Sequence, residues 1–199
     1  MGLTYQPPPL SGALRQGEIL GPIWDHRALV PPTELPKGQQ VAIASSPHPL
    51  RVVLSPDCDL LWDFEARFEL PDPDRNGDEE PFEQNPDAVT QVLLCDLFSH
   101  AQMRARFKGM REQWRRVDQN QDERYHRLDA APVAESDLSL QRLYLDFKKV
   151  TSVPTAALYE GILLGDVKRV ALIPDVWIHD LIHRFYGFLS RVAVPDQDE

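Results

Sequence analysis

The run from Gln141 to Val153, QRLYLDFKKVTSV, constrains the fold of this chain more than any other stretch. Its β-branched and aromatic residues are the types that strands favour, so it is predicted to form the best strand of the protein. A helix is predicted to begin at Pro174-Asp175, because apolar residues recur along one face: Trp177, Ile178, Leu181, Ile182, Phe185, Phe188 and Leu189. We therefore expect a β-rich core covered by a C-terminal amphipathic helix.

Shorter strands are predicted upstream of this run, where apolar or β-branched residues are bounded by turn residues. They cover residues 17–21, 40–45, 51–55, 91–97 and 124–128. Eighteen prolines favour loops and strand ends over long helices. The expected fold is mainly β with α additions. Residues 17–199 are expected to form a single barrel-like domain, and residues 1–16, which contain three consecutive prolines, a flexible N-terminal arm.

Two segments of opposite charge interrupt the strands. Residues 69–88 hold eight acidic residues against the single Arg75, a local charge of −7, and are predicted to be a mobile acidic insertion loop. A helix is predicted to start at the N-cap Ser99, with one apolar face formed by Met103, Phe107, Met110, Trp114 and Val117. Its other faces carry six basic residues against Glu112, a local charge of +5. One hypothesis is that the loop covers this helix and blocks an anionic partner; another is that the loop is a protease-sensitive tip.

Composition excludes several classes of function. The net charge of −10 argues against bulk attraction to nucleic acid or to an anionic membrane. No apolar run approaches the roughly 18 residues of a membrane span, so the protein is predicted to be cytoplasmic and to make no membrane contact. Cys58 and Cys95 are too few for a disulfide framework or a four-thiolate zinc site. No phosphate-binding glycine loop is present, and no cofactor or metal is expected.

Four motifs follow one another along the chain ahead of the C-terminal helix. They are Gly17-Glu18-Ile19, the strand Arg51–Ser55, the apolar Val92-Leu93-Leu94 and the strand Leu143–Val150. This order resembles that of the MazF/PemK toxin family, whose members carry a Gly-acid-Ile opening, a Val-Leu-Ser strand and a late Leu-Leu-Asp-Gln-Ile-Arg-Thr-Val strand. The resemblance implies an SH3-like barrel of the MazF/PemK type, here with an inserted basic helix and a C-terminal helix. Active members of that family cleave single-stranded RNA.

The chain departs from the toxin pattern where the toxins carry an Arg-Pro pair before their Val-Leu-Ser strand. Here His48-Pro49 stands at that place and Arg51 lies inside the strand. We therefore expect a non-catalytic protein-binding or regulatory module of a bacterial toxin–antitoxin or antiviral defence system. The alternative is an active single-strand-specific endoribonuclease, with the candidate catalytic residues His48, Arg51, Ser99, Arg124 and His126. In such an enzyme arginine would neutralise phosphate and histidine would transfer protons.

In the module hypothesis the basic helix contacts the partner. The candidate partner-binding residues are Arg104, Lys108, Arg111, Arg115 and Arg116. The expected partner is another protein of the same operon, and RNA or a second copy of the chain are further candidates. A solvated amphipathic helix that binds nothing explains the same pattern.

Two smaller constellations have structural explanations beside functional ones. Cys58 is flanked by Asp57 and Asp59, whose charges disfavour the thiolate, so residues 55–59 are predicted to form a tight turn. His179 and His183 stand four residues apart, as in zinc-binding helices, although no third ligand is evident. A metal-dependent enzyme is therefore a third hypothesis, and a pair of surface histidines is its structural alternative.

Overall fold

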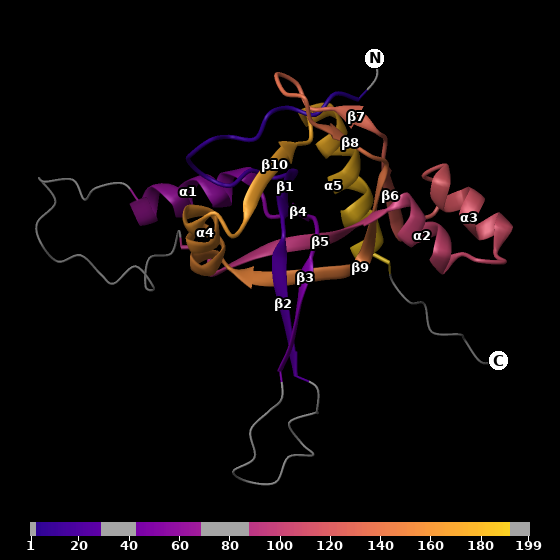
Figure 1. Cartoon of the computed structure of the whole chain (residues 1–199), viewed down its shortest axis with the longest axis horizontal. Coiled ribbons are helices and arrows are strands. Elements are labelled where there is room, and N and C mark those ends of the chain that lie inside the picture. The colour runs from indigo at the N-terminus through magenta and orange to yellow at the C-terminus, as the bar shows by residue number, and fades with distance from the viewer. Residues whose placement is uncertain (1–2, 29–42, 69–87, 192–199) are drawn as a thin grey trace, which may run out of the picture.

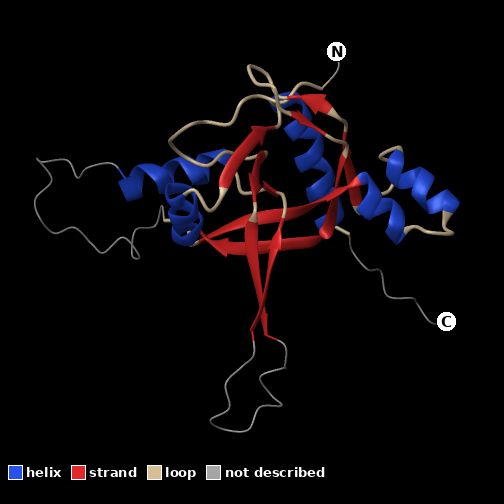
Figure 2. Ribbon diagram, viewed as in Figure 1, coloured by secondary structure: helices blue, strands red, loops and turns tan. Residues whose placement is uncertain are grey.

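The computed structural model describes residues 3–28, 43–68 and 88–191. Its centre is a curled antiparallel sheet of six strands in the order β10-β1-β4-β5-β9-β6 (Figures 1 and 2). These strands are β1 (Glu18–Gly21), β4 (Arg51–Val53), β5 (Gln91–Ser99), β6 (Tyr125–Leu128), β9 (Leu143–Pro154) and β10 (Lys168–Leu172). The expectation of a mainly β fold with α additions is confirmed at this level.

Two hairpins and five helices complete the described part of the chain. The hairpins pair β2 (Ile23–Ala28) with β3 (Ile43–His48), and β7 (Ala131–Pro132) with β8 (Ser139–Leu140). The helices are α1 (Asp57–Phe68), α2 (His100–Arg106), α3 (Arg111–Asp118), α4 (Thr155–Leu164) and α5 (Asp175–Leu189). Figure 1 shows α1 and α4 at one end of the molecule, α2 and α3 at the other, and the β2–β3 hairpin extending away from the sheet.

The strand predicted from the run Gln141–Val153 is the longest of the sheet. It is β9, and it pairs with β5 on one side and with β6 on the other. The pairing of β5 with β9 shifts register after Cys95. Cys95 lies opposite Val150, whereas Leu97, two residues later, lies opposite Leu145, five residues earlier on β9. Such a bulge bends a strand and re-aims its side chains. Two acidic residues, Asp96 and Asp146, lie in this irregular interval.

Helix α5 covers one face of the sheet, as the apolar stripe predicts. Ile178, Leu181 and Phe185 are buried in the main core cluster, and the Phe185 ring lies 5.5 Å from that of Phe147 on β9. The stripe is narrower than expected, because Trp177 is 36% exposed and Leu189 is 59% exposed. Both lie at the margins of the apolar face, where a helix leaves the sheet surface.

The other face of the sheet carries two separate apolar clusters. Side chains alternate between the faces along each strand, so Cys95 faces the α5 core while Leu94 does not. One cluster packs under α1 and α4 and includes Leu60, Leu94 and Leu158. The second packs under α2 and α3 and is formed by Phe98, Met103, Phe107, Val117, Tyr125 and Tyr144. Asp96 on β5 lies between Leu94 of the first cluster and Phe98 of the second, so the charged residues at this point of the sheet stand between two apolar regions.

Several local predictions are wrong. Of the tight turn expected over residues 55–59, residues 57–59 are the start of α1, whose first turn holds the two acids that favour a helix N-terminus. The single helix expected after Ser99 is two helices, because Gly109 takes a left-handed conformation with φ of 84°. Helix α4 and strand β10 were not predicted at all. Of the strand expected over residues 40–45, residues 43–45 belong to β3, and residues 40–42 lie outside the described residues.

The segment expected to be a flexible N-terminal arm lies against the domain from residue 3 onward. Tyr5 and Leu14 are fully buried. The Tyr5 amide donates to the Pro132 carbonyl at 3.0 Å, and the Gln6 amide donates to that of Leu172 at 2.8 Å. Residues 69–87 of the predicted acidic loop lie outside the described residues.

Candidate functional site

A buried ion pair occupies the polar strip between the two apolar clusters. Arg51 on β4 lies directly opposite Asp96 on β5, and its Nε donates to Asp96 Oδ1 at 2.8 Å. The Arg51 side chain is 1% exposed and that of Asp96 is 7% exposed. His48, at the end of β3, places its Nε2 at 3.4 Å from the second carboxylate oxygen of Asp96. The pair therefore ties the base of the β2–β3 hairpin to the main sheet.

A second buried carboxylate, Asp146 on β9, lies at the same bulge. It is fully buried and accepts two hydrogen bonds of 2.7 Å from Nε and Nη2 of Arg124. Arg106 of α2 adds a contact at 3.4 Å, and the backbone amide of Lys148 donates at 3.1 Å. Hydrogen bonding to Asp146 raises the pKa of Arg124, so this guanidinium stays charged. Bidentate geometry of this kind is among the strongest ion-pair arrangements.

Phe98 connects the two ion-pair groups. The Arg106 guanidinium lies 3.9 Å from the centre of the Phe98 ring, and the His48 ring meets the same phenyl edge-on at 5.5 Å. We call the set His48, Arg51, Asp96, Phe98, Arg106, Arg124 and Asp146 the bulge cluster. It combines residues from β3, β4, β5, β6, β9 and α2 or from positions directly beside them.

In the bulge cluster, the side chains predicted to be catalytic are bonded to other residues of the protein. His48 Nδ1 lies 2.9 Å from the Leu50 carbonyl oxygen while Nε2 faces Asp96, so both ring nitrogens face acceptors. Proton transfer needs a nitrogen that can reach the substrate. Arg51 is enclosed, and Arg124 is held by Asp146. The cluster can therefore stabilise the bulge and the hairpin, and its histidine is poorly placed as a general base.

Ser99 has a structural role that the sequence also predicted. It is the N-cap of α2, where its Oγ accepts from the Gln102 amide at 3.3 Å and the Gln102 side chain accepts from the Ser99 amide at 2.8 Å. This reciprocal pair is a capping box. The hydroxyl is thus occupied in holding the start of the helix.

His126 lies apart from the other candidates. It is 2% exposed, and burial together with the charges of Arg184 and Arg127 lowers its pKa to about 3. Its Nδ1 lies 4.0 Å from the carboxylate of Asp180 on α5, but that side chain is 58% exposed and water screens it. His126 is therefore a neutral core residue near pH 7. The structure brings His48, Arg51 and Arg124 into one cluster, with Ser99 beside it, and leaves His126 outside.

Sequence reasoning missed the two acids of the bulge cluster, as well as Phe98 and Arg106. A signal was present, because Asp96 interrupts the apolar run VLLCDLF and Asp146 interrupts LYLDF. Acids inside buried strands are almost always paired. The neighbouring Cys95 is also buried, and burial raises the pKa of its thiol far above the ordinary value, which makes it unreactive.

The predicted partner-binding residues lie on α2, on α3 and in the connection between them. Arg104, Lys108, Arg111, Arg115 and Arg116 are all exposed. Arg115 is engaged by Glu112, which accepts from its Nε at 3.1 Å and its Nη2 at 2.6 Å, and this bonding lowers the pKa of Glu112. Within the described residues, Arg111 and Arg116 take part in no ion pair. We call this surface the basic helical surface.

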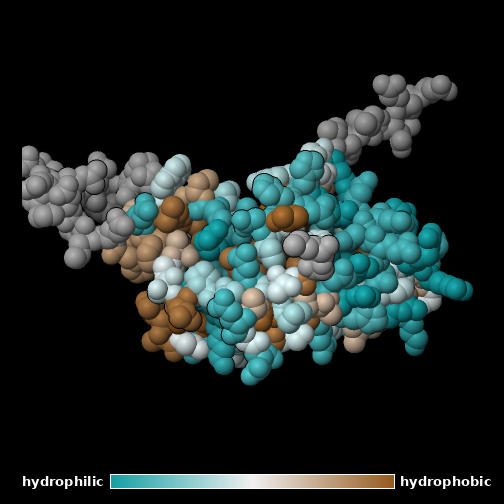
Figure 3. Space-filling view, turned by 90° about the horizontal axis from the view of Figure 1, so that it is seen from above, coloured by the Kyte–Doolittle hydropathy of each residue, from teal (hydrophilic) through white to brown (hydrophobic). Residues whose placement is uncertain are grey.

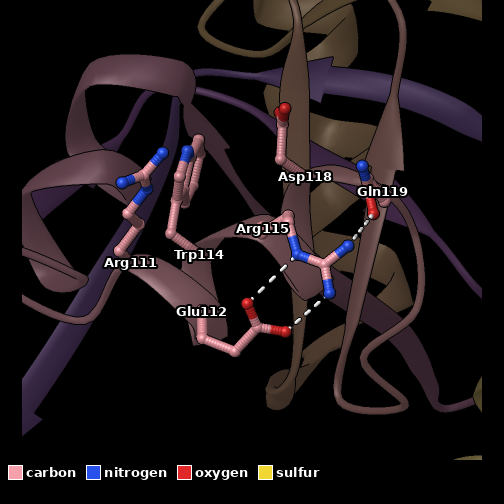
Figure 4. Close-up of a pocket in the computed structure, with 6 residues that line it drawn as sticks. All are labelled: Arg111, Glu112, Trp114, Arg115, Asp118 and Gln119. Atoms are coloured by element: carbon pink, nitrogen blue, oxygen red, sulfur yellow. Dashed lines mark hydrogen bonds and ion pairs between the residues drawn. The ribbon is translucent and has the colours of Figure 1, made fainter.

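A pocket of about 410 Å³ opens on the basic helical surface (Figure 4). It is lined by Arg111, Glu112, Trp114, Arg115, Asp118 and Gln119. Figure 4 shows Arg111 and Trp114 side by side on one side of the pocket, whereas Arg115 turns toward Glu112 and Gln119. The pocket thus offers, beside an aromatic ring, the Arg111 guanidinium, which has no ion-pair partner in the part of the chain that the structure describes.

The histidine pair of α5 and Cys58, the remaining candidates from the sequence, do not form a metal or catalytic site with other described residues. His179 and His183 are exposed on α5, and among the described residues no three His, Cys, Asp or Glu side chains are placed to hold a metal ion. Cys58 is exposed, with its Sγ at 3.3 Å from an oxygen of Asp59. None of the helices in the described part of the chain is long and apolar enough to span a membrane.

Comparison of the chain with family models, with curated proteins and with solved structures finds no match.

Proposed function

We propose that this chain is a non-catalytic protein-binding module of a bacterial toxin–antitoxin or antiviral defence system, built on an SH3-like barrel of the MazF/PemK type. Its partner is another protein encoded in the same operon. The system and the barrel type rest on the motif resemblance, and the lack of catalysis rests on the bulge cluster.

The motifs that resemble the toxin family fall on neighbouring strands. Glu18-Ile19 lies in β1, Arg51–Val53 forms β4, Val92-Leu93-Leu94 lies in β5 and Leu143–Val150 lies in β9. These four strands are consecutive in the sheet order β1-β4-β5-β9. Motifs dispersed over most of the chain thus make one continuous surface of the sheet, which supports a barrel of the toxin type.

The observation that carries the proposal is the state of the five candidate catalytic residues. Arg51 and His126 are buried, Ser99 caps α2, Arg124 is clamped by Asp146, and both ring nitrogens of His48 face acceptors. An RNase needs an exposed base and an exposed phosphate-binding cation at one place. The exposed cations of the basic helical surface are not part of the bulge cluster, whose one cation on α2 is Arg106, paired with Asp146.

The first experiment asks whether the purified chain cleaves RNA. We expect a mixed-sequence single-stranded RNA to stay intact at every enzyme concentration, including stoichiometric amounts. Cleavage that disappears in the Arg51→Ala or His48→Ala variant would replace the proposal with the endoribonuclease alternative, in which these two side chains, both in contact with Asp96, would act together.

The second experiment asks whether the basic helical surface recruits the partner. The variant Lys108→Glu/Arg111→Glu changes two exposed residues, one in the connection between α2 and α3 and one at the first position of α3, where an acid is favoured by the helix dipole. The control Lys149→Glu/Lys168→Glu makes the same change of charge at exposed positions on β9 and β10. The operon-encoded partner should co-purify with the wild type and the control and be lost from the first variant. Equal recovery with both variants would contradict the proposal.

A further inference from the structure

The basic helical surface contrasts with the rest of the molecule. Residues 100–118 carry six basic and two acidic side chains, a net charge of +4, so the rest of the chain carries −14 against a total of −10. In Figure 3 the end of the molecule that holds α2 and α3 is mostly hydrophilic, and hydrophobic residues gather toward the end that holds α1 and α4. Charge separation of this size orients an approaching charged partner.

Buried side chains and hydrogen bonds attach the basic helical surface to the sheet. Met103 and Val117 are fully buried in the cluster beneath α2 and α3. At the end of α3, the Asp118 carboxylate accepts two hydrogen bonds, one of 2.6 Å from the Tyr144 hydroxyl and one of 3.2 Å from the Arg142 guanidinium. A surface that is ordered before binding loses less conformational entropy when a partner docks.

Trp114 gives this surface an apolar anchor. Its ring is packed against His100 at 5.3 Å, Tyr144 at 5.5 Å and Phe107 at 6.1 Å, with the Arg104 guanidinium 5.4 Å from the ring centre. The remaining side of the ring lines the pocket beside Arg111. Tryptophan and arginine together are the residues most often found at the energetic centres of protein interfaces.

The two acidic residues that line the pocket favour a peptide over a nucleic acid as its partner. Glu112 and Asp118 both line it, and Glu112 already neutralises Arg115. A nucleic acid would bring a closely spaced row of phosphates against these carboxylates. A peptide can place one carboxylate at Arg111 and an uncharged side chain beside them. The mixed charge of the pocket therefore fits a protein segment better than RNA.

We infer that the pocket between Arg111 and Trp114 binds an acidic peptide segment of the partner, in which one carboxylate pairs with Arg111 and one aliphatic side chain packs on Trp114. This inference rests on the proposed function and names the chemistry of the partner. The ion pair between Arg111 and the peptide carboxylate attracts and orients the segment. The contact between Trp114 and the aliphatic side chain makes the pocket prefer this segment to other polyanions.

The test uses fluorescence anisotropy with the full chain and three labelled probes. The first is an acidic peptide with a single central leucine, the second is the same peptide with serine in place of leucine, and the third is a single-stranded oligouridylate of equal net charge. The leucine peptide should bind about fivefold more tightly than the serine peptide, because part of the leucine is removed from water. It should also bind more tightly than the oligouridylate at physiological salt.

Two charge-reversal variants distinguish binding in the pocket from general attraction to a basic surface. Arg111→Glu should weaken leucine-peptide binding about tenfold. Arg116→Glu makes the same change of charge on the same helix, but Arg116 does not line the pocket, so its effect should be clearly smaller. Equal binding of the leucine and serine peptides, tighter binding of the oligouridylate, or equal effects of the two variants would each overturn the inference. None of these results involves RNA cleavage, whose detection would overturn the proposed function instead.

Discussion

The sharpest stability prediction concerns Asp96, the acid at the centre of the bulge cluster. Asp96→Asn keeps the shape of the side chain and removes its charge, which leaves Arg51 as a cation whose side chain is only 1% exposed. Removing one partner of a buried ion pair costs about 3–5 kcal/mol, because the other charge remains desolvated. For a chain of this size that loss corresponds to a fall in melting temperature of roughly 6–20 °C.

The measurement is urea unfolding followed by far-ultraviolet circular dichroism, with thermal unfolding as a second readout. The control Glu112→Gln breaks the exposed Glu112–Arg115 pair and should leave the unfolding midpoint unchanged. The double variant Arg51→Met/Asp96→Leu removes both charges and should be more stable than Asp96→Asn, because no buried charge is left alone. A loss in Asp96→Asn no larger than that of the control would refute the account of the bulge cluster as a desolvated ion pair.

Two further predictions concern residues that were candidates for catalysis. The pKa of His126 is lowered from its ordinary 6.5 to about 3, so below pH 6.5 the unfolded chain takes up a proton that the folded chain excludes. Stability should fall by up to about 1.4 kcal/mol per pH unit as the pH drops from 6.5 toward 3, and His126→Leu should flatten that dependence in urea titrations across this window. A pH dependence identical in the two proteins would contradict the burial argument. Ser99→Ala removes the capping box of α2 and should cost about 1 kcal/mol in thermal unfolding, whereas Ser99→Asp, which keeps an N-cap acceptor, should cost less.

Elements with a strong periodic signal could be predicted from the sequence. The run that became β9 and the apolar stripe of α5 were both found, and Ser99 was correctly read as an N-cap. Helix α4 was missed because it follows β9 without a turn, its N-cap Pro154 being the last residue of the strand. Helix α1 was missed because the Ser-Pro-Asp sequence that begins it is equally typical of a turn.

The candidate site was predicted less well than the fold. Three of the five candidate catalytic residues, His48, Arg51 and Arg124, lie in the bulge cluster, but whether such residues can act as catalytic groups depends on what their atoms contact. Those contacts are set by Asp96 and Asp146, which both lie in the interval where β5 and β9 shift register against each other. A register shift depends on long-range pairing and leaves no local pattern in the sequence.

The buried charges of the bulge cluster also favour particular pairings of neighbouring strands. An apolar replacement of a buried ion pair is often at least as stable as the pair itself, so stability alone does not account for the two carboxylates. They lie between the apolar cluster under α1 and α4 and the one under α2 and α3, on the face away from α5. The Arg51–Asp96 pair links β4 to β5, and the Arg124–Asp146 pair links the residue before β6 to β9. A buried charge must lie beside its arginine, so each pair favours a single register between the two strands that it links. Arg106 of α2 contacts Asp146 at 3.4 Å and lies over the Phe98 ring, so the bulge cluster also holds α2, and with it the basic helical surface on which the proposed function depends, against the sheet.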